Sequence, residues 1–156
     1  TLAALDPVSM RELIRDVHLR IDQFAIGRAE TLSLQGSYDV IGGGSGWTFA
    51  KVSHQSARER MVATGVRAAV ELFGERDLPS GKRFFYAVWR RSEYIVGFPV
   101  ARILQALNAA EGYAPVDAGG WGGADNVGGS PRAKGSALAP ADVERIVNDV
   151  LSDART

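Results

Sequence analysis

Residues 84–89 read Phe-Phe-Tyr-Ala-Val-Trp, and the run is apolar at both its odd and its even positions. Because successive side chains of a strand point to opposite faces of a sheet, the run predicts a central strand that is covered on both sides. Helical patterns surround this strand along the chain. We therefore expect an α/β fold, with a mixed β-sheet packed by three helices and a long N-terminal connector helix.

The helices are predicted from apolar residues that recur at helical spacing. The leading helix begins at Pro7, has Ser9 and Glu12 at the spacing of a capping box, and runs into the low thirties. Gly74 and Gly112 stand where glycine caps of later helices belong. The three later helices are expected over residues 56–73, 99–111 and 140–151.

Shorter strands are predicted around the central one. They are expected at residues 38–41, 47–52 and 94–96. The glycine cluster at residues 42–46 suits a hairpin turn between the first two, and residues 75–81 are expected to form another turn. We divide the chain into a connector helix, residues 1–34, and one α/β domain, residues 35–156.

Composition limits the classes of function. The 156 residues include 18 basic and 18 acidic side chains, so the chain is not a wholly basic nucleic-acid binder, although a local basic patch is compatible with this sum. The absence of cysteine excludes disulfides, thiol nucleophiles and cysteine-ligated metals, and fits a reducing compartment. No apolar run approaches the roughly 20 residues that span a bilayer. We expect a cytoplasmic protein without a membrane partner.

Residues 119–136 are rich in glycine and carry basic side chains near their end. Glycine lets a ligand approach the main chain, and successive exposed N–H groups form an anion-binding nest. Arg132 can hold a phosphate bidentately, whereas Lys134 acts as a point charge. The same composition is also typical of an ordinary surface loop. The candidate contacts to an anion are the backbone of Gly128 and Gly129 and the side chains of Ser130, Arg132, Lys134 and Ser136.

Other side chains could also serve a ligand. Arg90 and Arg91 end the central strand, and strand ends commonly face ligand sites in α/β folds. Because alternation sends these two side chains to opposite faces, only one of them is expected to serve a site. Trp121 could stack on a base or anchor the loop onto the core. His18 and His54 lack metal-ligand spacing, and we find no Asp, Glu or His cluster that would hold catalytic metals.

The order of elements over residues 47–151 resembles the DHH-associated C-terminal domain of DHH-type phosphoesterases. That domain has a strand ending in an Arg-Ser pair, a short helix, a loop of the type Gly-Gly-Gly-His-Pro-Arg-Ala-Ala-Gly, and a final helix. Here Arg91 and Ser92 match the pair, and residues 128–135, Gly-Gly-Ser-Pro-Arg-Ala-Lys-Gly, match the loop. The two helices are matched by residues 100–107 and 140–151.

The resemblance implies a substrate-binding part of a phosphodiester-hydrolysing enzyme. Members of the family cleave short RNA, single-stranded DNA or cyclic dinucleotides with manganese, which an Asp-His-His motif holds in a separate N-terminal domain. This chain has no His-His pair, so the manganese and the DHH catalytic domain are expected elsewhere in the intact protein. Ser130 stands where the family has histidine, and would donate a weaker hydrogen bond. Lys134 stands where the family has alanine.

We therefore expect the chain to grip a phosphate of a nucleotide or of short single-stranded RNA or DNA, and to present it to metals in the other domain. No catalytic residue is assigned in this chain. The alternative is a non-enzymatic protein-interaction module that uses the Gly-rich loop and the first helix, with a homodimer as one form of it. The expected ligand contacts are Arg91, Arg132 and the backbone of Gly128 and Gly129, supported by Ser92, Ser130, Lys134 and Ser136.

Overall fold

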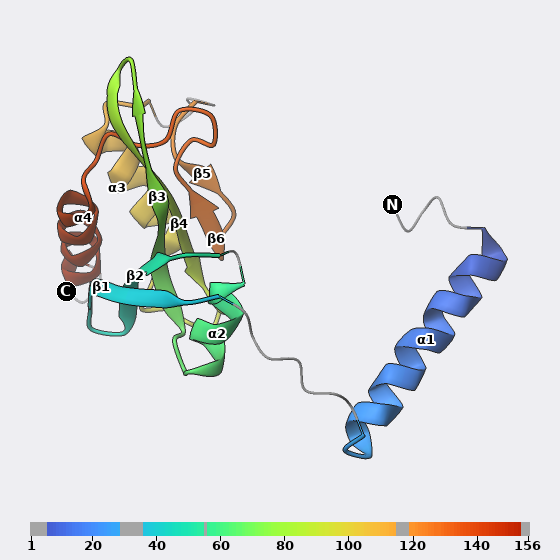
Figure 1. Ribbon diagram of the computed structural model, residues 1–156. Helices are drawn as coiled ribbons and strands as arrows, with labels where there is room; N and C mark the ends of the chain where they lie inside the picture. The colour runs from blue at the N-terminus through green and yellow to red at the C-terminus, as the bar shows by residue number, and fades with distance from the viewer. Residues whose placement is uncertain (1–5, 29–35, 55, 115–118, 154–156) are drawn as a thin grey trace. The chain divides into compact units, whose positions relative to one another are not determined.

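The computed structural model describes residues 6–28, 36–54, 56–114 and 119–153. They belong to two compact units, Thr1–Ser33 and Leu34–Thr156. The first unit contains one helix, α1 (Pro7–Ala25), and the second contains a six-stranded sheet with its helices (Figure 1). The predicted division between residues 34 and 35 lies outside the described residues.

Helix α1 begins where the sequence predicts, but its N-terminal cap is Asp6 and not Ser9. The Asp6 carboxylate accepts hydrogen bonds from the backbone N–H groups of Val8 and Ser9, at 2.8 and 3.2 Å, and from the Ser9 hydroxyl at 2.6 Å. These bonds, led by that of the Ser9 hydroxyl, hold the pKa of Asp6 below its usual value. The helix ends at Ala25 and not in the low thirties, because Gly27 has a φ of +69° and turns the chain out of helical geometry.

The apolar stripe predicted for α1 is present, and no side chain of this helix is buried. The predicted stripe consists of Met10, Leu13, Ile14, Val17, Ile21, Phe24 and Ala25. Five of these, Met10, Ile14, Val17, Ile21 and Phe24, follow one another in alternating steps of four and three residues, which is the heptad spacing of helices that pack against another helix.

Six strands make up the sheet of the second unit. They are β1 (Tyr38–Gly44), β2 (Trp47–Val52), β3 (Ala68–Leu78), β4 (Gly81–Arg90), β5 (Gly122–Gly123) and β6 (Val127–Gly129). Their order across the sheet is β1-β2-β3-β4-β6-β5. All neighbouring pairs are antiparallel except β2 and β3, which are parallel and are joined through α2 (Ala57–Ala63).

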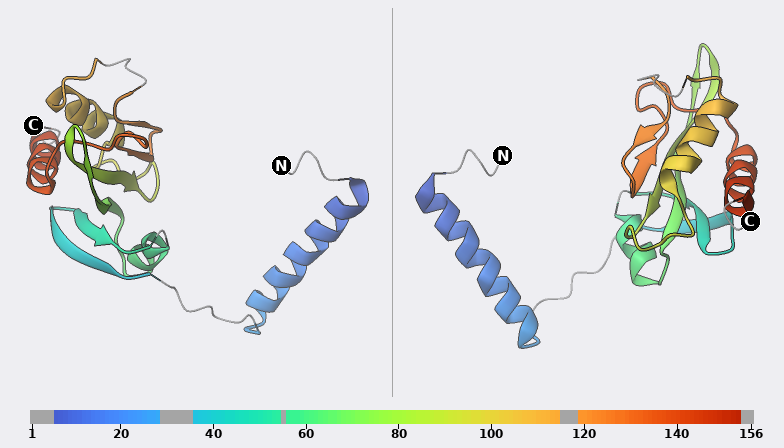
Figure 2. Two further views of the ribbon diagram at one scale, coloured as in Figure 1. Left: turned by 45° about the horizontal axis from the view of Figure 1, so that its top comes forward. Right: turned by 180° about the vertical axis from the view of Figure 1, so that it is seen from behind.

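Helices pack on both faces of this sheet. On one face α3 (Val100–Ala110) and α4 (Pro140–Asp153) form the larger core, to which β4 contributes Val88. On the other face α2 forms a smaller core, to which β4 contributes the next residue, Trp89. Figure 2 shows α3 and α4 beside the strands from behind. The predicted mixed sheet packed by helices is therefore confirmed, with α2, α3 and α4 as the packing helices. The run at residues 84–89 lies in β4, where Val88 and Trp89 are buried on opposite faces, whereas Phe85 and Ala87 are only half-buried.

The helix predicted over residues 56–73 is wrong in its second half. Helix α2 ends at Ala63, and the chain enters β3 at Ala68. Between them Gly65 adopts a φ of +97°, which ends the helix. The later apolar residues are instead paired in the sheet, where Val70 lies between β2 and β4. Pairing with β2 and β4 overrides the local helical pattern.

Two further expectations are corrected. Residues 94–96 lie in a turn segment and do not resume the strand; the Ile95 N–H donates to the Ser92 carbonyl at 3.1 Å. The predicted turn at residues 75–81 is shorter, because β3 and β4 extend almost to its middle. The Gly-rich stretch, expected to be a loop, contains the hairpin β5–β6 and thereby extends the sheet.

The short helix α2 covers only part of its face. Under it Glu71, 2% exposed, accepts two hydrogen bonds from Arg58, at 2.6 and 3.2 Å, and the same guanidinium lies 5.3 Å from the centre of the Trp89 ring. The next residue on this face of β3 is Phe73, which is 44% exposed. The part of the sheet that α2 covers therefore ends between Glu71 and Phe73, and beyond it an area of sheet is bare.

Candidate ligand-binding site

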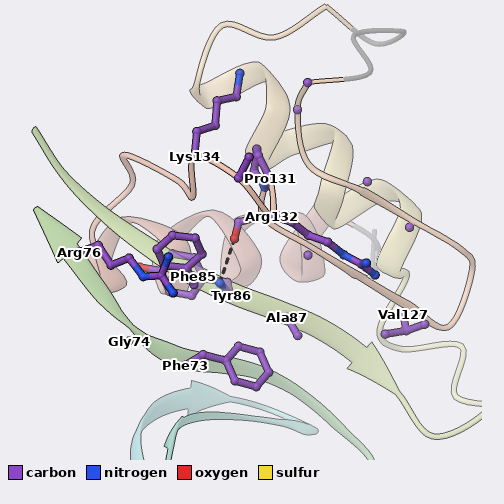
Figure 3. A pocket seen from close by; sticks show the side chains of 18 of the residues that line it. Phe73, Gly74, Arg76, Phe85, Tyr86, Ala87, Val127, Pro131, Arg132 and Lys134 are labelled. Atoms are coloured by element: carbon purple, nitrogen blue, oxygen red, sulfur yellow. Dashed lines mark hydrogen bonds between the residues drawn. The ribbon is translucent and has the colours of Figure 1, made fainter. Parts of the chain in front are cut away.

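The bare area of sheet forms the floor of an open pocket of about 1160 Å³. Strands β3 and β4 supply the floor, and the chain over residues 119–134 supplies the wall (Figure 3). We call it the sheet-face pocket. It contains five of the residues predicted to hold a ligand: Gly128, Gly129, Ser130, Arg132 and Lys134.

Aromatic rings from the two strands lie on the floor. Phe73 occupies the irregularity between Leu72 and Gly74, where β3 has one residue more than its partner β4. Phe85 follows on β4, and its ring is covered by the guanidinium of Arg76, which lies 4.9 Å from the ring centre. An aromatic and cationic floor of this kind suits a flat ligand that carries negative charge.

The cationic side chains of the pocket differ in whether a neighbouring group of the protein already holds them. Within the described residues neither Arg76 nor Arg132 forms an ion pair, whereas Glu75, the pocket's carboxylate, is held by Lys82 at 3.0 Å. The Lys134 ammonium lies 4.6 Å from the centre of the Tyr113 ring. In Figure 3 the Lys134 side chain points away from the floor, and that of Arg132 extends along the pocket over Ala87. Arg132 is therefore the predicted cation best placed to meet an anion.

The anion nest predicted at Gly128 and Gly129 is wrong. Both residues belong to β6, which is paired with β4 on one side and β5 on the other, so their backbone groups are directed at neighbouring strands. A Cβ atom added at Gly128 would lie 2.5 Å from the Leu104 side chain. One added at Gly129 would lie 2.5 Å from the Tyr86 carbonyl oxygen. These glycines are required for close packing of the hairpin and do not cradle a ligand.

The two serines also differ from expectation. Ser130 is 9% exposed; its hydroxyl accepts a hydrogen bond from the Tyr86 N–H at 3.0 Å, and its own N–H donates to the Tyr86 carbonyl at 3.1 Å (Figure 3). Ser136 is fully buried, donates to Glu111 at 2.9 Å and accepts from the Leu138 N–H at 3.0 Å. Both side chains fasten the segment to the fold. Ser136 is fully buried and is unsuited to a ligand, whereas the Ser130 hydroxyl only accepts in its bond with Tyr86 and keeps its proton to donate.

Arg91 and Ser92 lie away from the sheet-face pocket. The register pairs Ala87 with Gly129 and Trp89 with Val127, so the chain at Arg91 lies beyond the far end of β6. At about 3.4 Å per residue, this position is roughly 17 Å along the strand from Tyr86, the neighbour of Ser130. The Ser92 hydroxyl accepts from the Tyr94 N–H at 3.1 Å. The structure therefore does not bring the predicted Arg-Ser pair to Arg132.

Trp121 anchors the segment to the core, which settles the two interpretations left open by the sequence. It is 4% exposed and stacks on Tyr86 with ring centres 5.6 Å apart. Its indole N–H donates to Glu111 at 2.5 Å, and its backbone N–H to Asn108 at 2.7 Å. It has no free face for a base, and the wall of the pocket is held rigidly against α3.

Sequence reasoning missed Phe73, Arg76 and Phe85 as site residues. The sequence predicts Phe73 at the end of a helix and Arg76 in the turn over residues 75–81, so it relates neither of them to residues 119–134. The available signal was the glycine at position 65, a residue that can end a helix before β3 begins.

Comparison with known proteins does not assign the chain to a family. No protein-family model, curated protein or solved structure matches it. Within the described residues no three His, Cys, Asp or Glu side chains gather into a group that could hold a metal ion. None of the helices that the structure describes is long and apolar enough to cross a lipid bilayer. The likeness to DHH-associated domains stays a prediction from the motif.

Proposed function

We propose that the second unit binds a phosphate-bearing ligand, a nucleotide or a short single-stranded nucleic acid, in the sheet-face pocket. One observation carries the proposal: Arg132 and Arg76, which have no carboxylate partner in the described chain, flank an open floor of aromatic side chains. A guanidinium binds phosphate through paired hydrogen bonds, and aromatic rings hold bases by stacking.

The local charge of the pocket supports this ligand class although the chain as a whole is neutral. Three cations line the pocket against one carboxylate, and that carboxylate, Glu75, is paired with Lys82. A pocket with positive charge and apolar walls raises the local concentration of an anionic ligand.

The resemblance to DHH-associated domains extends the proposal to a larger protein. In such a protein this unit would present the phosphodiester to manganese held by a separate catalytic domain, in the cytoplasm. Arg132 occupies the motif position that the resemblance assigns to the anion, and its side chain reaches into the pocket. The Ser130 hydroxyl accepts from the Tyr86 N–H and can still donate its own proton to the ligand, from the position where the family has histidine.

The test is the affinity of the full chain for a short 5′-phosphorylated single-stranded oligonucleotide, titrated at fixed salt. We expect Arg132→Ala to weaken binding tenfold or more, because a hydrogen bond to a charged group contributes about 1.5–3 kcal/mol. Arg102→Ala is the matched control: Arg102 is an exposed arginine on α3 that does not line the pocket. Equal affinities of Arg132→Ala and the unsubstituted chain would refute the proposal.

A second candidate function rests on α1. Its apolar stripe at heptad spacing is uncovered within its own unit, and such a stripe is typical of a helix that packs against a second helix. A protein-interaction module of this kind can coexist with ligand binding, since the two features belong to different units. Truncation of the chain separates the two, as described below.

A further inference from the structure

The exposed ring of Phe73 has no structural role that accounts for its position. It is 44% exposed, whereas Val70 and Leu72 on the same strand are buried in the larger core. It belongs to neither core, and it stands at a bulge, a device that re-aims a side chain. An aromatic ring left bare on the floor of a pocket favours a contact with a ligand.

The surroundings of the ring leave it accessible. Its neighbour Gly74 has a φ of +151°, and an added Cβ there would have no atom within 4 Å, so the space beside Phe73 is open. On the same face of β4 the small Ala87 is paired with Glu71, two residues before Phe73 on β3, and in Figure 3 the Phe73 ring lies near this short side chain. The other floor ring, Phe85, is already covered by Arg76.

We propose that Phe73 is a stacking platform for a nucleobase, and so makes the pocket prefer nucleotides to phosphorylated compounds that lack a base. This inference rests on the proposed function, because Arg132 is assigned the phosphate of the same ligand. A base presents a flat π-face that every nucleotide shares, so the platform favours nucleotides as a class and does not select one base.

The experiment compares two ligands that differ only in the base, adenosine 5′-monophosphate and ribose 5-phosphate, by calorimetric titration of the full chain. We expect the nucleotide to bind about tenfold more tightly, since stacking on one aromatic ring contributes about 1–3 kcal/mol, and 1.4 kcal/mol is a factor of ten. In Phe73→Ala the two affinities should become equal, with that for ribose 5-phosphate unchanged. Phe73→Trp should keep the preference.

Tyr94→Ala is the matched control, because Tyr94 is an aromatic residue, 85% exposed, that does not line the pocket. It should bind both ligands like the unsubstituted chain. If neither ligand binds the unsubstituted chain, the proposed function fails and the inference fails with it. If both bind equally well, or if Phe73→Ala weakens both by the same factor, the stacking platform alone is refuted.

Discussion

At the scale of single residues, Tyr86 joins the sheet to the segment that forms the pocket wall. Its hydroxyl donates to the Leu138 carbonyl at 2.9 Å, its ring stacks on Trp121, and its backbone is bonded to Ser130. Burial raises the pKa of the Tyr86 hydroxyl well above its ordinary value, and the nearby carboxylates of Asp142, Glu111 and Glu75 raise it further. The side chain therefore stays neutral in the folded protein at every physiological pH.

This shift predicts a loss of stability in alkali. In the unfolded chain Tyr86 ionises near pH 10, while the folded chain keeps the proton, so the free energy of unfolding should fall as pH rises above about 10. Tyr86→Phe should show a shallower fall between pH 9 and 11, and should be less stable at pH 7 by about 1 kcal/mol because one hydrogen bond is lost. Urea denaturation across this pH range measures both effects. If the free energy of unfolding fell equally steeply with pH in the two proteins, the raised pKa of Tyr86 would be contradicted.

At the scale of elements, the hairpin β5–β6 depends on glycine because its strands and α3 approach closely. A Cβ at Gly128 would lie 2.5 Å from the Leu104 side chain and 2.8 Å from the Gly122 carbonyl. At Gly122 a Cβ would meet no atom within 4 Å. The two positions thus form a matched pair for testing how the pocket wall is built.

We expect Gly128→Ala to lower the free energy of unfolding by about 1–3 kcal/mol, the usual cost of overpacking, and to weaken ligand binding by shifting the wall. Gly122→Ala should change stability by less than about 0.5 kcal/mol, as for most surface substitutions. Chemical denaturation of both variants checks this. Were Gly128→Ala as stable as Gly122→Ala, glycine would not be needed for packing of the hairpin.

The same scale shows where prediction from sequence worked. The strand over residues 47–52 and the helices that open near Pro99 and at Pro140 match the structure, because a proline or glycine marks their ends and local periodicity marks their buried face. The prediction failed for β3. Its apolar residues also fit a helical face, and only pairing with β2 and β4 distinguishes the two interpretations.

At the scale of the whole molecule, both cores consist of residues from the second unit. We therefore expect a chain of residues 34–156 to unfold within about 2 °C of the full chain, less than the shift that 1 kcal/mol produces in a domain of this size. Ligand affinity should be unchanged as well. Thermal unfolding measures the stability, and the titrations above measure the ligand affinity. If the shorter chain were clearly less stable or bound the ligand more weakly, α1 would have a role in the pocket-bearing unit.

Light scattering of the same two chains tests the second candidate function. If the stripe of α1 packs against a second copy, the full chain has the mass of a dimer and the chain of residues 34–156 that of a monomer. If both chains have the mass of a monomer, self-association through α1 is ruled out, and the sheet-face pocket remains as the functional feature.

The pattern of the sequence alone determined the fold class, the central strand and the two helices that begin near Pro99 and at Pro140, since these depend on neighbours along the chain. The local motif also predicted Arg132 as a ligand residue, and the structure places it in the lining of the pocket. Only the tertiary structure decided that Gly128, Ser130 and Ser136 serve packing, that Arg91 lies apart, and that Phe73 and Arg76 join Arg132. The physical reason is that strand register and a bulge set which side chains meet. The bulge follows from the pairing of β3 with β4, and the wall follows from the pairing of β4 with β6, a strand far along the chain.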